Sequence, residues 1–263
     1  MISPTTTKVI LLSLLIALAL TPVSAGNSRR LISSDPLARG LDLAARKYPD
    51  EAAVEFDKCT DLTRVTPHQL SLIAKAYYDA GNTSSALIII AYAVSQERVK
   101  REIGEMAYLL DLRGTVLALL NRRDEAISSY KLAAATQPDL AYVYWHKVGR
   151  ELVKCKKYKE ALPFLKKGIK AGRMNGFVYT DIGHCYMLLD SPAEAIEPLT
   201  ESINTFVEAR KRDHDAYMPS LIQSYKYLIQ AYEAIGDKKQ ASVWQKRLDA
   251  LVGDFNLDLF GEH

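Results

Sequence analysis

Small and large apolar residues recur along the middle of the chain with the spacing of helices that pack in pairs. Between residues 107 and 204, a glycine stands twelve residues ahead of an alanine three times: Gly114 and Ala126, Gly149 and Ala161, and Gly183 and Ala195. The three alanines are separated by 35 and 34 residues. A pattern that returns at an interval of this length indicates an internal repeat.

The residues around each alanine describe the repeating unit. Large apolar residues precede the alanine by sixteen and nine positions, and another follows it by four; in the first copy these are Leu110, Leu117 and Tyr130. A small residue follows the alanine by seven positions: Ala133, Gly168 or Ser202. Large residues at helical spacing fill a core, whereas small residues mark places where two helix backbones come close. Each unit is therefore expected to be a helical hairpin.

Weaker copies extend the pattern on both sides. Ala52 and Ala86 serve as earlier anchors and Ala241 as a later one, with longer steps of 40 residues up to Ala126 and 46 residues after Ala195. The first long step predicts an extended helix or a longer loop over residues 95–105. The second predicts an elongated second helix over residues 205–216.

The repeat resembles the tetratricopeptide repeat (TPR) family, which has a period of 34 residues and a pattern of large, small and aromatic positions around an alanine. The best copy is LLDLRGTVLALLNRRDEAISSYKLAAATQP, residues 109–138. The resemblance implies an all-α, right-handed α-α superhelical solenoid of about six TPR-like hairpins over residues 35–255. The expected repeats are about 33–66, 67–100, 107–140, 142–175, 176–209 and 222–255, followed by a C-terminal tail at 256–263.

Two prolines follow their anchor alanines closely. Pro163 and Pro198 stand two and three residues past Ala161 and Ala195. We expect them near the start of a helix, where a missing amide is harmless. They are then expected to delay these helices without breaking them.

The first 25 residues have the pattern of a secretory signal. Lys8 ends a short n-region, an apolar run follows from Val9 to Leu20, and Val23, Ser24 and Ala25 form a small-residue cleavage site. The apolar run is shorter than the ~20 residues of a spanning helix, which favours cleavage over an uncleaved anchor. We expect an exported protein of the periplasm or medium, or of the secretory lumen in a eukaryote, with a polar lead-in at 26–34.

Composition and motifs limit the chemistry. The chain of 263 residues is 48% apolar and 25% charged, with a net charge of +3, which is ordinary globular composition and points to neither nucleic acid nor membrane. Its five histidines are scattered, and it carries no phosphate-binding glycine loop, zinc-type cysteine pairs or GxSxG motif. We therefore expect no enzyme activity and no cofactor.

Two smaller possibilities remain open from the residues. His146, Asp181 and His184 could face one another and hold a metal, although polar groove residues are the favoured interpretation and no metal is expected. Cys155 and Cys185 could pair in an oxidising compartment, although nothing in their spacing brings them together. Cys59 occupies a small-residue position and is expected to be a buried hydrophobe.

The resemblance implies that the first helices of the hairpins line a groove that takes a partner peptide. Counting eighteen, fifteen, eleven and eight residues back from the anchors places polar and aromatic groups there. We expect the binding residues to be Lys75, Tyr78, Tyr108, His146, Arg150, His184, Lys226 and Gln230. The same count adds His68, Ser71, Asp111, Thr115, Ala118, Val143, Val153, Phe177, Thr180, Met187, Gln223 and Glu233. The carboxylate clamp of heat-shock co-chaperones is absent, because Leu37 and Leu41, or Ser71 and Lys75, stand in its places.

The fourth repeat is strongly basic. Residues 142–175 carry ten Lys and Arg against two Glu, a balance of 10 − 2 = +8. The charge is either a solvated outer face or a surface for an acidic partner. We expect an exported scaffold or adaptor that binds a protein or peptide in its groove during envelope or secretory-machinery assembly. The alternative is a binder of an anionic polymer or membrane surface through the fourth repeat. The oligomeric state does not follow from the sequence.

Overall fold

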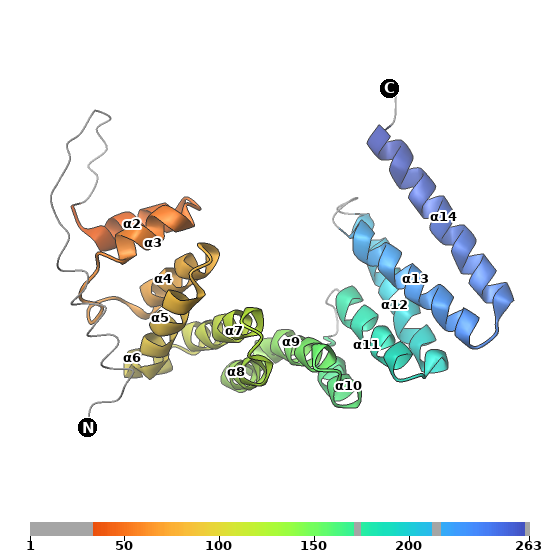
Figure 1. The fold of residues 1–263 in the computed structure, drawn as a ribbon, viewed down its shortest axis with the longest axis horizontal. Helices are drawn as coiled ribbons and strands as arrows, with labels where there is room; N and C mark the ends of the chain where they lie inside the picture. The colour runs from red at the N-terminus through yellow and green to blue at the C-terminus, as the bar shows by residue number, and fades with distance from the viewer. Residues whose placement is uncertain (1–33, 171–174, 212–216, 261–263) are drawn as a thin grey trace. The chain divides into compact units, whose positions relative to one another are not determined.

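The computed structural model describes residues 34–170, 175–211 and 217–260, the last with side chains up to Gly253, and its regular elements in these ranges are all helical (Figure 1). The expected signal at 1–25 and nearly all of the lead-in at 26–34 lie outside the described residues. The helices are α2 (Pro36–Ala45), α3 (Pro49–Phe56), α4 (Pro67–Asp79), α5 (Thr83–Ser95), α6 (Glu97–Lys100), α7 (Ile103–Leu119), α8 (Arg123–Thr136), the 3-10 helix η2 (Pro138–Leu140), α9 (Ala141–Lys154), α10 (Tyr158–Lys167), α11 (Gly176–Leu188), α12 (Pro192–Arg210), α13 (Met218–Ala234) and α14 (Lys238–Phe260). The expectation of an all-α fold is confirmed.

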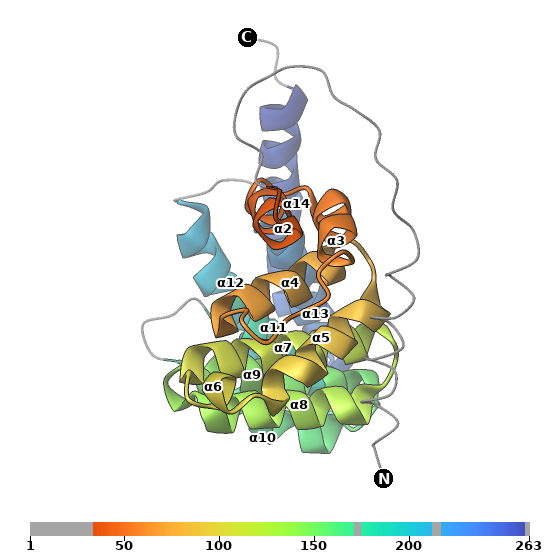
Figure 2. The same ribbon diagram turned by 90° about the vertical axis from the view of Figure 1, so that its left-hand side faces the viewer.

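The helices pair as antiparallel hairpins in two compact units. Unit 1, residues 1–137, holds the pairs α2/α3, α4/α5 and α7/α8; unit 2, residues 138–263, holds α9/α10, α11/α12 and α13/α14. The two helices of each pair pack along each other, and successive pairs within a unit pack in turn (Figure 1 and Figure 2). Six hairpins are thus present in the described ranges, as the repeat pattern predicts.

The turn inside every hairpin has the same geometry. Five residues ahead of each anchor alanine stands a residue with a left-handed backbone: Lys47, Gly81, Asn121, Lys156, Asp190 or Gly236. In the fourth repeat, the amide of Lys156 donates to the carbonyl of Val153 at 2.8 Å and that of Lys157 to Leu152 at 2.9 Å, the two bonds of a Schellman motif. Since both bonds recur in all six turns, the turns mark the repeats independently of the apolar pattern.

The glycines mark close helix crossings, as the sequence predicts. A Cβ atom on Gly149 would lie 2.5 Å from Leu165 Cδ2, and one on Gly114 would lie 2.5 Å from Tyr130 Cε1. In both pairs the large residue lies four positions after an anchor alanine that is itself fully buried. In these two hairpins the first helix can therefore approach the second closely because it carries no side chain at the crossing.

Pro163 and Pro198 correct one expectation. Pro163 lies inside α10, which begins at Tyr158, and Pro198 lies inside α12, which begins at Pro192. The helices are not delayed, because the Schellman turn lets the second helix begin two residues after the left-handed residue. Each proline instead removes one amide donor from the interior of its helix.

The irregular spacings also have a structural explanation. The long step over residues 95–105 contains the short helix α6 and an early start of α7 at Ile103. The second long step extends α12 as far as Arg210, as expected, while residues 212–216 lie outside the described residues. Helix α14 continues to Phe260, beyond the expected end of the last repeat at residue 255. None of the helices in the described ranges is both long and apolar enough to cross a membrane.

Candidate functional site: a groove in unit 2

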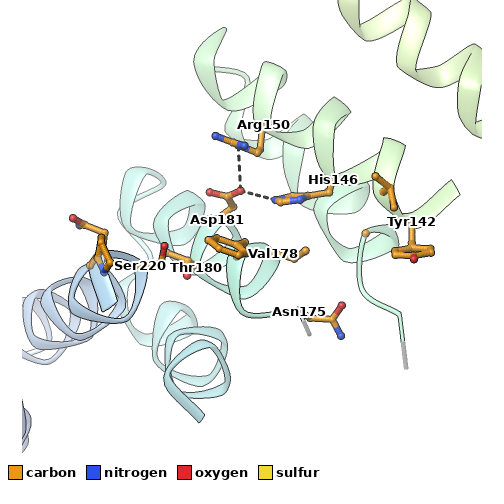
Figure 3. Close-up of a pocket in the computed structure, with 13 residues that line it drawn as sticks. Tyr142, His146, Arg150, Asn175, Val178, Thr180, Asp181 and Ser220 are labelled. Carbon is orange, nitrogen blue, oxygen red and sulfur yellow. Dashed lines mark hydrogen bonds and ion pairs between the residues drawn. The ribbon is translucent and has the colours of Figure 1, made fainter. Parts of the chain in front are cut away.

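A groove with a volume of about 840 Å³ opens on unit 2 and is formed mainly by its first helices α9, α11 and α13 (Figure 3). We call it the unit 2 groove. Its lining consists of Tyr142, Val143, His146, Arg150, Gly168, Asn175, Phe177, Val178, Thr180, Asp181, Pro219, Ser220 and Gln223. The volume is of the size that small ligands or a few side chains of a peptide occupy.

Helical spacing explains why these side chains share one surface. On α9, Val143, His146 and Arg150 are three and four residues apart, which places them on one face of the helix. Gly168, just past the end of α10, packs against the base of this face, since a Cβ atom there would lie 3.1 Å from His146 Cβ. The bare backbone of Gly168 therefore lets the hairpin close beneath His146.

Asp181 on α11 contacts both His146 and Arg150 of α9. His146 Nε2 lies 2.7 Å from Asp181 Oδ2, and Arg150 Nε lies 3.7 Å from the same oxygen (Figure 3). Because a carboxylate only accepts, the His146 Nε2 atom carries the proton of this hydrogen bond. Arg150 is 56% exposed whereas Asp181 is 31% exposed. The long, solvated Arg150 contact is the weaker of the two, so the guanidinium can still donate to a ligand.

Three hydroxyl groups join the helices beneath the groove. Thr180 Oγ1 lies 2.7 Å from Ser202 Oγ and 2.9 Å from Ser224 Oγ, and the two serine oxygens lie 2.9 Å apart. Ser202 and Ser224 are fully buried. The network fixes α11 against α12 and α13 and gives every hydroxyl a partner, so the floor of the groove is polar without being unsatisfied.

Aromatic rings form the apolar part of the groove. Phe177 is 43% exposed and meets Phe206 edge-on with the ring centroids 5.0 Å apart. At the other side, Lys170 Nζ lies 4.7 Å from the centroid of the Tyr142 ring, a cation–π contact. Asn175 is tied to the backbone of Lys170 by two hydrogen bonds, at 2.9 and 3.2 Å. A large exposed ring backed by packed aromatics offers a rigid surface for an apolar side chain.

Two of the expected binding residues, His146 and Arg150, line the unit 2 groove, as do Val143, Phe177, Thr180 and Gln223 from the same positional count. Three others in unit 2, His184, Lys226 and Gln230, do not belong to its lining. The His184 ring stacks on Tyr227 with centroids 4.6 Å apart. Burial there lowers the pKa of His184.

The sequence left open that His146, Asp181 and His184 face one another and hold a metal. His146 and Asp181 are in contact, but the His184 ring is stacked on the Tyr227 ring. Within the described ranges, no group of three or more His, Cys, Asp or Glu side chains is arranged to hold a metal ion.

The remaining expected residues, Lys75, Tyr78 and Tyr108, lie in unit 1. Lys75 Nζ bonds both oxygens of Asp79, at 2.7 and 2.6 Å, on its own helix α4. Burial, followed by the nearby carboxylates of Asp79, Asp111 and Glu105, raises the pKa of Tyr108 to about 12. These side chains are engaged with neighbours inside unit 1.

The positional count missed several lining residues. Asp181 entered only as a metal candidate, yet it is adjacent to Thr180, which the count placed in the groove. Its acidic character beside a groove position was the available signal. Asn175 lies in a loop, where helical periodicity gives no information, and Ser220 comes from the first turn of α13, ahead of the counted positions.

The cysteines are free, so the disulfide between Cys155 and Cys185 that the sequence left open is not formed. Cys185 is buried, and this burial raises the pKa of its thiol to about 12. Cys59 is only partly buried, less than expected; burial raises the pKa of its thiol to about 11. The neutral form of both thiols is therefore favoured.

Comparison with known proteins places the fold. No family model matches the sequence. A BBSome complex member BBS4 homolog of Drosophila melanogaster is 27% identical over 169 residues, which are 64% of this chain and 33% of the relative, so the chain spans about a third of that protein's length. MamA (residues 41 to the end) from Desulfovibrio magneticus RS-1 superposes with a TM-score of 0.55 at 19% identity, covering 72% of this chain and 96% of that one.

The third similar protein is named for the TPR repeat. The C-terminal part of a TPR repeat-containing protein from Cytophaga hutchinsonii superposes with a TM-score of 0.55 at 15% identity, covering 82% of this chain and 95% of that one. This chain has a TPR-like repeat fold. The identities with the solved structures are too low to carry more than the fold, so function rests on the residues of this chain.

Proposed function

We propose that the protein is a non-enzymatic TPR-like scaffold whose unit 2 groove binds an extended segment of a partner protein. The observation that carries the proposal is the lining itself, in which three first helices combine an exposed guanidinium with an exposed phenylalanine over a hydrogen-bonded floor. Arginine and aromatic residues are the side chains that most often dominate the energy of protein interfaces. A TPR-like fold supports a protein partner in general terms.

We further propose that the protein works outside the cytoplasm, in the assembly of envelope or secretory machinery. The support is the signal-like pattern of residues 1–25. Sequencing the N-terminus of the protein recovered from cells tests this step. A start at or near Gly26 is expected, and an intact Met1 in a membrane pellet would contradict it.

The second candidate is binding to an anionic polymer or membrane surface through the basic fourth repeat. It is favoured by the exposed Lys166 and Lys167 of α10, whose ammonium groups lie 5.7 Å from the ring centroid of Tyr186 and 5.3 Å from that of Trp145. Such contacts hold the charges at the surface. Binding of this kind should weaken steeply with salt, whereas groove binding through an aromatic surface should not.

A peptide selection distinguishes the two candidates. Peptides are enriched from a random phage-displayed library on the full chain, and their binding is measured to the parent, to Gln223→Trp and to Lys159→Trp. Gln223 is an exposed groove residue of α13, so tryptophan there should fill the groove, while Lys159 is exposed on α10 outside the lining. Loss of binding in Gln223→Trp alone is expected. Peptides that bind all three proteins equally would refute the groove proposal.

A further inference from the structure

The lining of the unit 2 groove is unequal in charge. Its described residues include one carboxylate, Asp181, against the guanidinium of Arg150 and the imidazole of His146, and the ammonium of Lys170 lies over Tyr142 at the rim. An anion on a ligand meets the guanidinium of Arg150 in the lining and the ammonium of Lys170 at the rim, against the single carboxylate of Asp181.

Arg150 is better placed to bond a ligand than to bond Asp181. The Asp181 carboxylate already bonds His146 at 2.7 Å, and its contact with Arg150, at Nε, is 3.7 Å long. That contact is too long for a strong charge-assisted hydrogen bond, which is usually shorter than ~3 Å. The planar guanidinium therefore retains donors for a planar acceptor, which a carboxylate matches in two parallel bonds.

The charge of the ligand group is limited by the same residues. A dianion such as a phosphate would bring two negative charges close to Asp181, and among the lining residues the guanidinium of Arg150 is the one Lys or Arg group to neutralise them. A carboxylate brings one. The geometry thus favours a side-chain carboxylate over a phosphorylated residue, since like charges at short range oppose binding.

The apolar half of the groove adds a second requirement. Phe177 is held by the edge of Phe206, and Val143 on α9 is exposed as well. Burying these two side chains requires an apolar group on the ligand, and each apolar Å² removed from water contributes ~25 cal/mol. A segment of acidic residues alone would leave this surface exposed.

We infer that the unit 2 groove recognises a protein segment that carries both an aspartate or glutamate, bound by Arg150, and an aliphatic or aromatic side chain, packed against Phe177. This inference rests on the proposed function and specifies the class of its ligand. Asp181 is a positioning residue, because it orients His146 and approaches Arg150 at its Nε edge.

The test uses the peptides enriched on the full chain. Each is compared with one copy in which its acidic residue becomes the amide and another in which its largest apolar residue becomes alanine. Either change should weaken binding to the parent by roughly tenfold to a hundredfold, the loss expected for hydrogen bonds to a charged group or for a buried large side chain.

A charge-reversal variant of the protein is the decisive comparison. Arg150→Glu should weaken binding of the acidic peptide by a similar factor. It should also bind more tightly the peptide in which lysine replaces the acidic residue, because the introduced carboxylate would stand beside that of Asp181. Lys159→Glu, an exposed change on α10 outside the lining, should change neither. Thermal melts of each variant establish that it folds.

The outcomes separate this inference from the proposed function. If Gln223→Trp abolishes binding while neither the amide peptide nor Arg150→Glu changes it, the groove binds peptides but the ligand class is wrong. If Gln223→Trp leaves binding intact, the groove proposal itself fails. A preference for phosphopeptides over their carboxylate counterparts would also overturn the inference.

Discussion

Lys75 in unit 1 and Arg150 in unit 2 occupy the same position of the repeat, eleven residues ahead of an anchor alanine. Their charged groups nevertheless have different partners. One turn after Lys75 stands Asp79, and the two side chains bond at 2.6 Å on the surface of α4. One turn after Arg150 stands Lys154, which bonds Glu151 instead. Arg150 therefore reaches to Asp181 on the next hairpin at 3.7 Å and stays largely exposed.

A histidine–carboxylate contact across hairpins occurs in both units. In unit 1, His68 Nδ1 lies 2.8 Å from Glu105 Oε1, and Ser71 donates to the other oxygen of Glu105. In unit 2, the partner carboxylate of His146 is also the one beside Arg150. The repeat places Lys75 and Arg150 at equivalent positions, and for these two side chains the residue one turn away on the same helix, Asp79 or Lys154, decides whether the positive charge is available to a ligand.

The largest expected effect tests what the two units share. Gly114→Leu in unit 1 and Gly149→Leu in unit 2 should each lower the free energy of unfolding by about 3 kcal/mol, because the new side chain must displace Tyr130 or Leu165. Gly104→Leu is the control, since a Cβ atom at Gly104, on the same helix as Gly114, meets nothing within 4 Å. Urea unfolding measures all three. Equal tolerance at the three positions would mean that the hairpin packing is wrong.

The next effect tests a feature that is particular to unit 2. Ser202 lies seven residues after its anchor, where unit 1 has Cys59, Ala93 or Ala133, and it takes part in the hydroxyl network under the groove. Ser202→Ala should cost about 1 to 2 kcal/mol in unfolding free energy, because Thr180 and Ser224 lose a buried partner.

Its control is Ser128→Ala on α8 of unit 1, where an exposed hydroxyl bonds only its own helix, at Asp124 O. Thermal and urea unfolding of the two variants should differ accordingly. A Ser202→Ala protein as stable as Ser128→Ala would show that the network does not hold the groove floor together.

The smallest effect tests the difference between the units directly. Lys154→Asp gives Arg150 an acidic neighbour one turn away, as Lys75 has in Asp79. It should weaken binding of the selected peptides by about 0.5 to 1 kcal/mol, slightly more than the usual worth of such a pair, because it also adds a negative charge near the ligand. Lys159→Asp makes the same change in charge away from Arg150 and should have no effect. Titration of a labelled peptide distinguishes them, and equal weakening by both would assign binding to general basic charge.

Much of the fold could be predicted from the sequence, because packing constrains the residues that carry it. The anchor alanines, the glycines that face large residues and the helical spacing around them all follow from two helices in close contact. The apolar pattern did not predict that Pro163 and Pro198 lie inside their helices. The helix start is set by backbone hydrogen bonds in the preceding turn, and four of the six left-handed residues in these turns are not glycine.

The candidate site could be predicted only in part. His146 and Arg150 follow from counting along α9, and so do Phe177 and Thr180 on α11. Which of the counted residues remain available depends on partners outside the repeat pattern, such as Asp79 for Lys75 and the Tyr227 ring for His184. Asn175 comes from a loop, where no periodicity applies.

Photo-crosslinking in living cells measures most directly whether a partner protein occupies the unit 2 groove. A photoreactive benzoylphenylalanine is placed at Gln223 in the unit 2 groove, at Lys75 in unit 1 or at Lys159 on α10, one position in each protein. We expect a covalent adduct with a partner protein from position 223 that disappears when Arg150→Glu is added, and none from positions 75 and 159. An adduct from position 75 or 159 with none from position 223 would contradict it.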